Sequence, residues 1–175
     1  MISLIKGHFN LEKRVFIILT IAALLLLSKE GFTQPPDPPR PIVVTTSQDL
    51  SFGAFTFAAS TGTVTITPAG FRSATGSGVV LLNLGTPTAA IFSIIANAGT
   101  LITITFGPVA TLLGSPSGTL TLHVNTSDPE SPFITTKDYP DPTLLYIGGT
   151  LTVGNSSTSP PGTYTGSFDI TLNQD

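Results

Sequence analysis

The sequence predicts an all-β protein, folded as an antiparallel β-sandwich of about eight or nine short strands. Three observations support this class. The segment from Thr163 to Leu172 alternates apolar and polar residues with a period of two, as a half-buried strand does. Short β-branched segments recur upstream, separated by Gly, Pro, Asn and Ser. No segment after residue 33 shows a helical period.

The N-terminal residues 1–33 have the layout of a secretory signal peptide. Lys6, Lys13 and Arg14 precede an uncharged apolar run, residues 15–27, which is too short to span a bilayer comfortably. We therefore expect export, cleavage before Gln34, and no stable membrane span afterwards. The flank Ser28-Lys29-Glu30 lacks the usual small residues of a cleavage site, so a retained anchor is the alternative.

Composition after the expected cleavage excludes several classes of partner and site. Three basic and eight acidic residues remain, a net charge of −5. This balance argues against binding to nucleic acid or to anionic membranes, both of which need clustered Lys and Arg. The chain contains no cysteine, which excludes disulfides and thiolate metal sites. Stability must therefore come from the burial of apolar surface.

A proline-rich arm, residues 34–41, is expected between the signal peptide and a sandwich domain of residues 42–175. Five of its eight residues are proline, which fixes φ and removes backbone donors, so it favours an extended polyproline II conformation. We expect it to act as a spacer. Recognition of the arm by a partner is the alternative.

The expected strands follow at short intervals through the domain. Residues 62–67, 101–106 and 119–125 alternate in the manner of strands with one wet face, whereas residues 79–84 and 89–96 are dense enough in apolar residues to be covered on both faces. The remaining expected strands are residues 42–46, 49–57 and the segment that ends the chain. In that last segment Tyr164, Phe168, Ile170 and Leu172 are expected to face the core from one continuous strand.

The connection over residues 126–142 is too long for an ordinary hairpin. It contains Asp128, Glu130, Asp138 and Asp141, but these carboxylates lack the spacing of a known calcium loop. A solvated loop stiffened by proline is therefore expected, with calcium binding as the alternative.

Reactive side chains are few, and we expect no enzyme. His123, the single histidine after residue 33, alternates with Leu122 and Val124 and is expected on the solvent face of its strand. No nucleophile elbow and no glycine-rich loop leading into a helix is present. The acidic residues lie in loops or, for Asp169, on an outer strand face, which does not suit glycoside hydrolysis. We assign no catalytic, cofactor-binding or metal-binding residue.

Several glycine-containing strand segments resemble the bacterial domain-of-unknown-function family 4402. They are residues 50–53, 62–66, 148–154 and 162–166, together with Gly70 and Gly76. That family is similar, more distantly, to spore coat protein U and to the subunits of chaperone-usher pili. The resemblance implies an immunoglobulin-like sandwich and a place at the cell surface. The chain departs from pilins in having no disulfide and in having Gln174, not an aromatic residue, as its penultimate residue.

We expect an exported, non-enzymatic structural or adhesive protein that reaches the cell surface through the periplasm. It is expected to have features of a fimbria-like subunit. Copies of itself or another surface protein are the expected partners. A soluble secreted binding module that uses the loop 126–142 is the alternative. Repeated Thr-x-Thr motifs, such as Thr63/Thr65 and Thr150/Thr152, raise ice binding as a remote third hypothesis. Threonine is, however, common on the wet face of strands.

Overall fold

The computed structural model describes residues 40–57 and 61–174, which fall within one compact unit, Pro39–Asp175. The expected signal peptide and residues 34–39 of the expected arm lie outside the described residues. All regular structure in the described residues is β, which confirms the predicted class. The thirteen strands are β1 (Val43–Gln48), β2 (Phe55–Phe57), β3 (Gly62–Ile66), β4 (Arg72–Thr75), β5 (Val79–Leu81), β6 (Ala90–Ile95), β7 (Leu101–Phe106), β8 (Ala110–Ser115), β9 (Thr119–Asp128), β10 (Phe133–Ile134), β11 (Thr143–Val153), β12 (Thr163–Thr165) and β13 (Ile170–Gln174).

The largest sheet is antiparallel and has eight strands, in the order β1-β6-β11-β9-β8-β12, with β3 and β4 attached beside β11. Strand β11 is its centre. One edge of β11 pairs with β9, while the other pairs first with β6, over residues 143–147, and then with β3, over residues 149–153. Gly148 lies at this change of partner. A Cβ there would come within 2.5 Å of the Ile66 carbonyl oxygen, so only glycine allows β3 to approach so closely.

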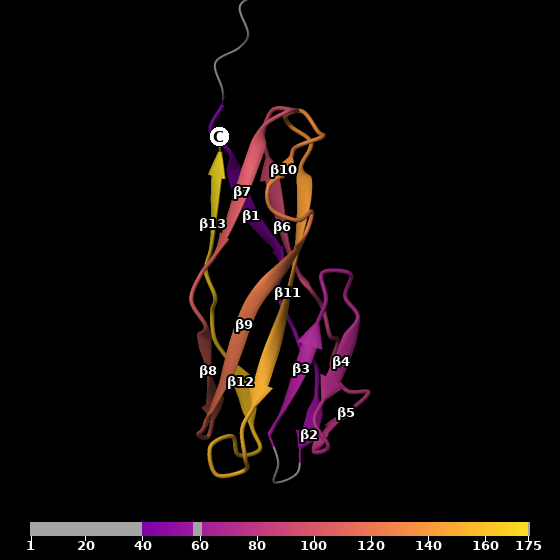
Figure 1. Ribbon diagram of the computed structural model, residues 1–175, viewed down its shortest axis with the longest axis vertical. Coiled ribbons are helices and arrows are strands. Elements are labelled where there is room, and N and C mark those ends of the chain that lie inside the picture. Colours follow the sequence, from indigo (N-terminus) through magenta and orange to yellow (C-terminus); the bar gives the residue numbers. More distant parts are fainter. Residues whose placement is uncertain (1–39, 58–60, 175) are drawn as a thin grey trace, which may run out of the picture. The chain divides into compact units, whose positions relative to one another are not determined.

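Two smaller sheets complete the domain. Strands β10, β7 and β13 form one of them, and β2 and β5 form the other. Figure 1 shows β7, β10 and β13 at the end of the domain where the C-terminus lies, and β2, β5 and β12 at the opposite end. The two small sheets share no hydrogen-bonded ladder. The layer formed by these sheets is therefore interrupted.

Side chains from all three sheets form one apolar core. Its most deeply buried members come from β3, β6, β7 and β11, and the larger of them include Ile66, Ile94, Ile102, Leu145, Ile147 and Leu151. Alternation accounts for this core, because consecutive residues of a strand point to opposite faces. In β9, for example, Leu120, Leu122 and Val124 are buried and the residues between them are exposed.

The strand that was predicted to end the chain is in fact two strands. β12 pairs with β8 in the large sheet, whereas β13 pairs with β7 in a different sheet, so the chain changes sheets between residues 165 and 170. The prediction of which residues face the core is nevertheless confirmed. Tyr164 of β12, Phe168 between the two strands, and Ile170 and Leu172 of β13 all pack against the core.

The prediction of a solvated loop over residues 126–142 is only partly correct, because most of these residues are exposed but the segment contains strand pairing and two buried side chains. β9 continues to Asp128, and β10 pairs with the start of β7. Phe133 and Thr135 are buried, with 7% and 2% of their surface exposed. The Ser131 hydroxyl bonds the backbone of Ile104, accepting from its N–H at 2.8 Å. This segment is part of the packed domain.

Strand count and length also differ from expectation. The predicted strand 49–57 is reduced to β2 and an isolated bridge at Ser51, because Gly53 has a φ of +63° that interrupts an extended chain.

The predicted strand 79–84 ends at Leu81, and Val80 within it is 56% exposed, so it is not covered on both faces. β4 and β8 were not predicted. β4 has four residues with a single apolar one, and the adjacent Leu112 and Leu113 obscure a period of two in β8.

Candidate interaction groove

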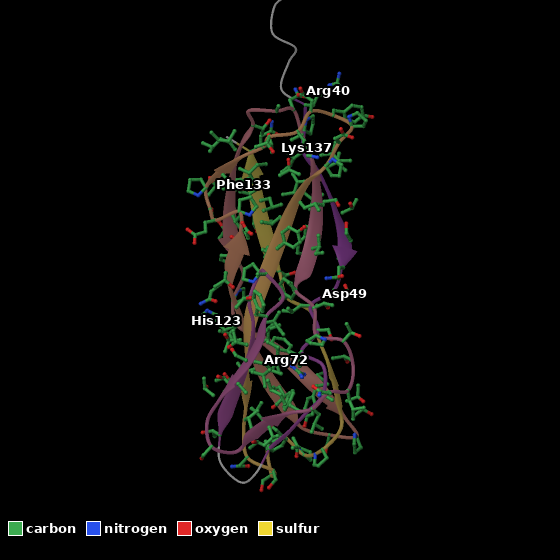
Figure 2. The ribbon with its side chains drawn as sticks, turned by 90° about the vertical axis from the view of Figure 1, so that its right-hand side faces the viewer. Arg40, Asp49, Arg72, His123, Phe133 and Lys137 are labelled. Atoms are coloured by element: carbon green, nitrogen blue, oxygen red, sulfur yellow. The ribbon has the colours of Figure 1, made fainter. Side chains whose placement is uncertain are left out.

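The single histidine of the described residues does not belong to a reactive cluster. His123 is exposed on β9, opposite Thr150 of β11, which confirms its predicted place on the solvent face. Figure 2 shows its side chain at the side of the ribbon. Nowhere in residues 40–57 and 61–174 do three His, Cys, Asp or Glu side chains gather as a metal site requires.

The four acidic residues of the segment 126–142 are exposed and have separate surroundings. Asp138 accepts a hydrogen bond at 2.8 Å from the backbone N–H of Ala98, and so holds the turn before β7. Tyr139, beside it, lies under the guanidinium of Arg40, 5.2 Å from the ring centre. These contacts join the segment to its neighbours and give it a structural role.

A groove of about 910 Å³ lies in the half of the domain that contains β2 and β12. One wall is formed by residues 48–57, which include β2, and the other by residues 160–168, which include β12. Its floor is the inner face of the large sheet and consists of Ala90, Phe92, Leu112, Leu120, Leu122 and Leu151. The groove exists because the layer opposite the large sheet is interrupted at this point.

Both walls of the groove contain a strand with one unused edge. In the described part of the chain, β2 pairs only with β5, and β12 pairs only with β8. A strand inside a sheet has a neighbour on each side, so the second edge of each strand retains backbone N–H and C=O groups without a ladder partner. The groove therefore has an apolar floor, and each of its two walls contains a strand with one edge that has no ladder partner in the described part of the chain.

Six aromatic side chains line the walls and floor of the groove. Phe52, Phe55, Phe57, Phe92, Tyr164 and Phe168 all line the groove, and all but Phe52 are only partly buried. Phe92 and Phe168 meet edge to face, with ring centres 6.4 Å apart and ring planes at 89°. Asp49 is the one charged residue among those that line the groove. Among the described residues that line the groove, Asp49 is thus the one partner of opposite charge for a basic group of an occupant.

Arg72 holds one wall of the groove in place. Its guanidinium donates to the carbonyl oxygens of Phe52 and Ala54, at 2.9 and 3.1 Å, and to that of Leu82 at 2.7 Å. Three backbone acceptors from two segments are thus held by a single planar side chain of β4, whose several N–H groups point in fixed directions. The sequence alone does not reveal this role, because a lone arginine in a strand carries no local signal for it.

The groove could not be predicted from the sequence either. The floor contains Leu120, Leu122 and Leu151, which alternate with polar neighbours as ordinary core residues do. That pattern does not show that the described strands of the facing layer stop short of them. The one available signal is the density of phenylalanine between residues 52 and 57, in a segment broken by Gly53.

Comparison with known proteins places the chain in a family. Residues 40–57 and 61–174 contain no helix with the length and hydrophobicity that a membrane crossing requires. Neither the curated proteins nor the solved structures gave a significant match. A family model does match, over residues 42–174, which is almost the whole of the domain described above. The chain therefore belongs to the family described as domain of unknown function DUF4402.

Proposed function

We propose that this protein is an exported, non-enzymatic structural subunit of the cell surface, which assembles by taking an extended peptide segment into the groove between β2 and β12. The groove is the observation that carries this proposal. Export is supported by the sequence, in which basic residues precede the apolar run 15–27. Assembly is supported by the two unpaired strand edges above an apolar floor.

The free energy gained by such an insertion is of the same order as the cost of association. An extended segment pairs its backbone with a strand edge and places alternate side chains on the floor, which is how peptides add to sheets elsewhere. Each fully buried large apolar side chain contributes about 1.5–3 kcal/mol. Two or three such side chains contribute about 3–9 kcal/mol, and the hydrogen bonds add to this, so the total is comparable with the cost of association, about 4–15 kcal/mol. A single contact of this kind therefore has low to moderate affinity, and many subunits in one structure would reinforce it.

Leu112 and Leu113 provide a matched test of the groove. They are neighbours on β8, but Leu112 lies on the groove floor and Leu113 faces outward with 65% of its surface exposed. Sedimentation velocity should show concentration-dependent assembly of the unaltered protein and of Leu113→Glu. Leu112→Glu should remain monomeric, because its carboxylate would be buried beneath the inserted segment.

Folding of both variants is checked by circular dichroism and thermal melting. Thr163→Arg, at the exposed rim of the groove, provides a second block if Leu112→Glu does not fold. Groove variants that fold and assemble as well as the parent would refute the proposal.

Export is tested separately. N-terminal sequencing of protein recovered outside the cytoplasm should begin at or near Gln34, because the signal sequence is expected to be removed before that residue. Recovery of chains with intact Met1 from a membrane fraction would show instead that the N-terminal segment is retained.

A further inference from the structure

We propose that the open edge of β1 (Val43–Gln48) pairs antiparallel with the β1 of a second copy of this chain, so that two large sheets become one continuous sheet. This goes beyond the proposed function, because the contact does not need an occupied groove. Within residues 40–57 and 61–174, β1 lies at the end of the large sheet and pairs only with β6. Five of its six residues, from Val43 to Ser47, are exposed. The strand is therefore accessible along most of its length.

The sequence of β1 lacks the features that usually prevent an edge strand from pairing. Such strands commonly contain a charged residue, above all lysine, or a proline. β1 reads Val-Val-Thr-Thr-Ser-Gln, with no charge and no proline, and its first four residues are β-branched. Its one bulge lies between Thr46 and Gln48, so the ladder with β6 is regular from Val43 to Thr46. The edge is thus suited to accept a further strand.

Backbone groups of β1 are directed toward this open edge. Ile42, directly before β1, donates its N–H to Gln174 Oε1 at 3.2 Å. Gln174 belongs to β13 in another sheet, so this N–H points away from β6. Residues two apart direct their backbone groups to the same side of a strand. Val44 and Thr46 therefore present N–H and C=O groups along the open edge, whereas those of Thr45 are directed to β6.

The charges at the two ends of β1 favour an identical strand as the partner. Arg40 and Asp49 are exposed, and residues 41–48 between them carry no charge. Figure 2 shows these two residues near opposite ends of β1. Antiparallel pairing brings Arg40 of each copy to Asp49 of the other, whereas parallel pairing would place like charges together. Arg40 stacks on the Tyr139 ring, 5.2 Å from its centre, which leaves guanidinium N–H groups for a carboxylate.

The length of the uncharged stretch fixes the register. Residues 42–48 lie between Pro41, which has no N–H to donate, and Asp49, and Thr45 is at their midpoint. Full antiparallel overlap therefore places Thr45 opposite Thr45 of the second copy, as a non-hydrogen-bonded pair with a Cα separation of about 4.5 Å. Such a contact has two-fold symmetry and uses the same surface on both copies. Because each copy has one β1, the pairing closes at two.

The contact is small, and this determines where it acts. Seven residues per copy are fewer than the roughly 20–30 per side of a stable interface. Two free copies therefore pair weakly and remain largely monomeric in dilute solution. Copies that an assembly already holds close together pair more strongly, because their effective concentration is higher. β1 would thus join two rows of subunits side by side.

An introduced cysteine tests the pairing. The chain contains no cysteine, so a single one can form a disulfide only between two copies. The expected Cα separation lies within the range for disulfides, about 4.4–6.8 Å. Under mild oxidation at high protein concentration, Thr45→Cys in the full chain should form a dimer about tenfold faster than Thr121→Cys. Thr121 is the matched control, because it is exposed on β9, inside the sheet. Non-reducing electrophoresis measures both rates.

Charge reversal tests the direction of pairing. Arg40→Glu or Asp49→Lys, each added to Thr45→Cys, should lower the rate of cross-linking about threefold or more, because like charges then meet at both ends of the pair. The two reversals together should restore the rate to within about twofold of that of Thr45→Cys alone, because opposite charges meet again. Failure of the double reversal to recover the rate would refute antiparallel pairing.

The remaining outcomes decide the inference. Equal rates for Thr45→Cys and Thr121→Cys would refute it. The difference between these two variants should persist when Leu112→Glu, which blocks the groove, is added to both. Its loss would show that groove assembly, and not β1, brings the copies together, and the inference would be wrong. If circular dichroism shows that Thr45→Cys does not fold, a mixture of Val43→Cys and Ser47→Cys provides the same test, because pairing about Thr45 places residue 43 opposite residue 47.

Discussion

At the scale of single residues, Arg72 shows how one polar side chain organises a wall of the groove. Its three hydrogen bonds to carbonyl oxygens are charge-assisted, and such bonds contribute about 1.5–3 kcal/mol each when their partners are shielded from water. Arg72 is only partly buried, so we expect Arg72→Met to lower the free energy of unfolding by about 2–4 kcal/mol. Urea denaturation measures the change.

Arg40→Met is the control for this change. Arg40 is exposed and contacts the ring of Tyr139, an arrangement that contributes about 0.5–1 kcal/mol at a surface. A loss at Arg72 no larger than the loss at Arg40 would show that the three carbonyl contacts do not stabilise the domain.

Two buried threonines are expected to respond in opposite directions to the same substitution. Thr143 Oγ1 is buried and has no hydrogen-bond partner among the described residues. Thr135 Oγ1 donates to the Asn97 carbonyl oxygen at 2.6 Å and accepts from the Thr100 N–H at 3.0 Å. Thr143→Val should stabilise the domain by about 1 kcal/mol, because an unsatisfied hydroxyl is replaced by a methyl group. Thr135→Val should destabilise it by about 1–3 kcal/mol. Thermal melts of the two variants that shift in the same direction would contradict this account.

At the scale of elements, β10 provides a sharp comparison between neighbouring residues. Phe133 is 7% exposed and belongs to the core, whereas Ile134 is 59% exposed. Phe133→Ala should lower the free energy of unfolding by about 3–5 kcal/mol, the usual range for a buried phenylalanine. Ile134→Ala should change it by about 0.5 kcal/mol or less. Denaturant titrations with equal midpoints would mean that β10 does not pack against β7 as described.

The same elements show what the sequence could predict and why it stopped there. Alternation predicted the inward face of β9, with His123 on the outside, and the inward residues of β12 and β13. A period of two depends only on the local pleat, so it does not reveal a change of sheet, and the step from β12 to β13 was missed. The packing of Phe133 was missed for a similar reason. Its segment is rich in proline and acidic residues, and only contact with β7 and the core makes it part of the domain.

At the scale of the whole domain, the groove could not be predicted, because it lies where no strand of the described residues covers the large sheet. Each residue of its floor satisfies the pattern of a normal core position. The interruption arises from tertiary arrangement, in which β13 and β2 cover different halves of the large sheet and share no ladder. A property of this kind depends on the relative lengths and positions of several strands, which local patterning does not encode.

Stability of the whole domain should depend little on ionic strength. Residues 40–174 contain nine charged side chains, namely Arg40, Asp49, Arg72, Asp128, Glu130, Lys137, Asp138, Asp141 and Asp169. Arg72 bonds neutral carbonyls, and the other charges are exposed, so attractions and repulsions between them are weak in water. Raising NaCl from about 0.01 M to about 1 M shortens the screening length from about 30 Å to about 3 Å. We expect the free energy of unfolding, extrapolated from urea titrations, to agree between these conditions within the usual uncertainty of about 10–15%. A loss of several kcal/mol in high salt would show that ion pairs, and not the apolar core, hold the sheets together.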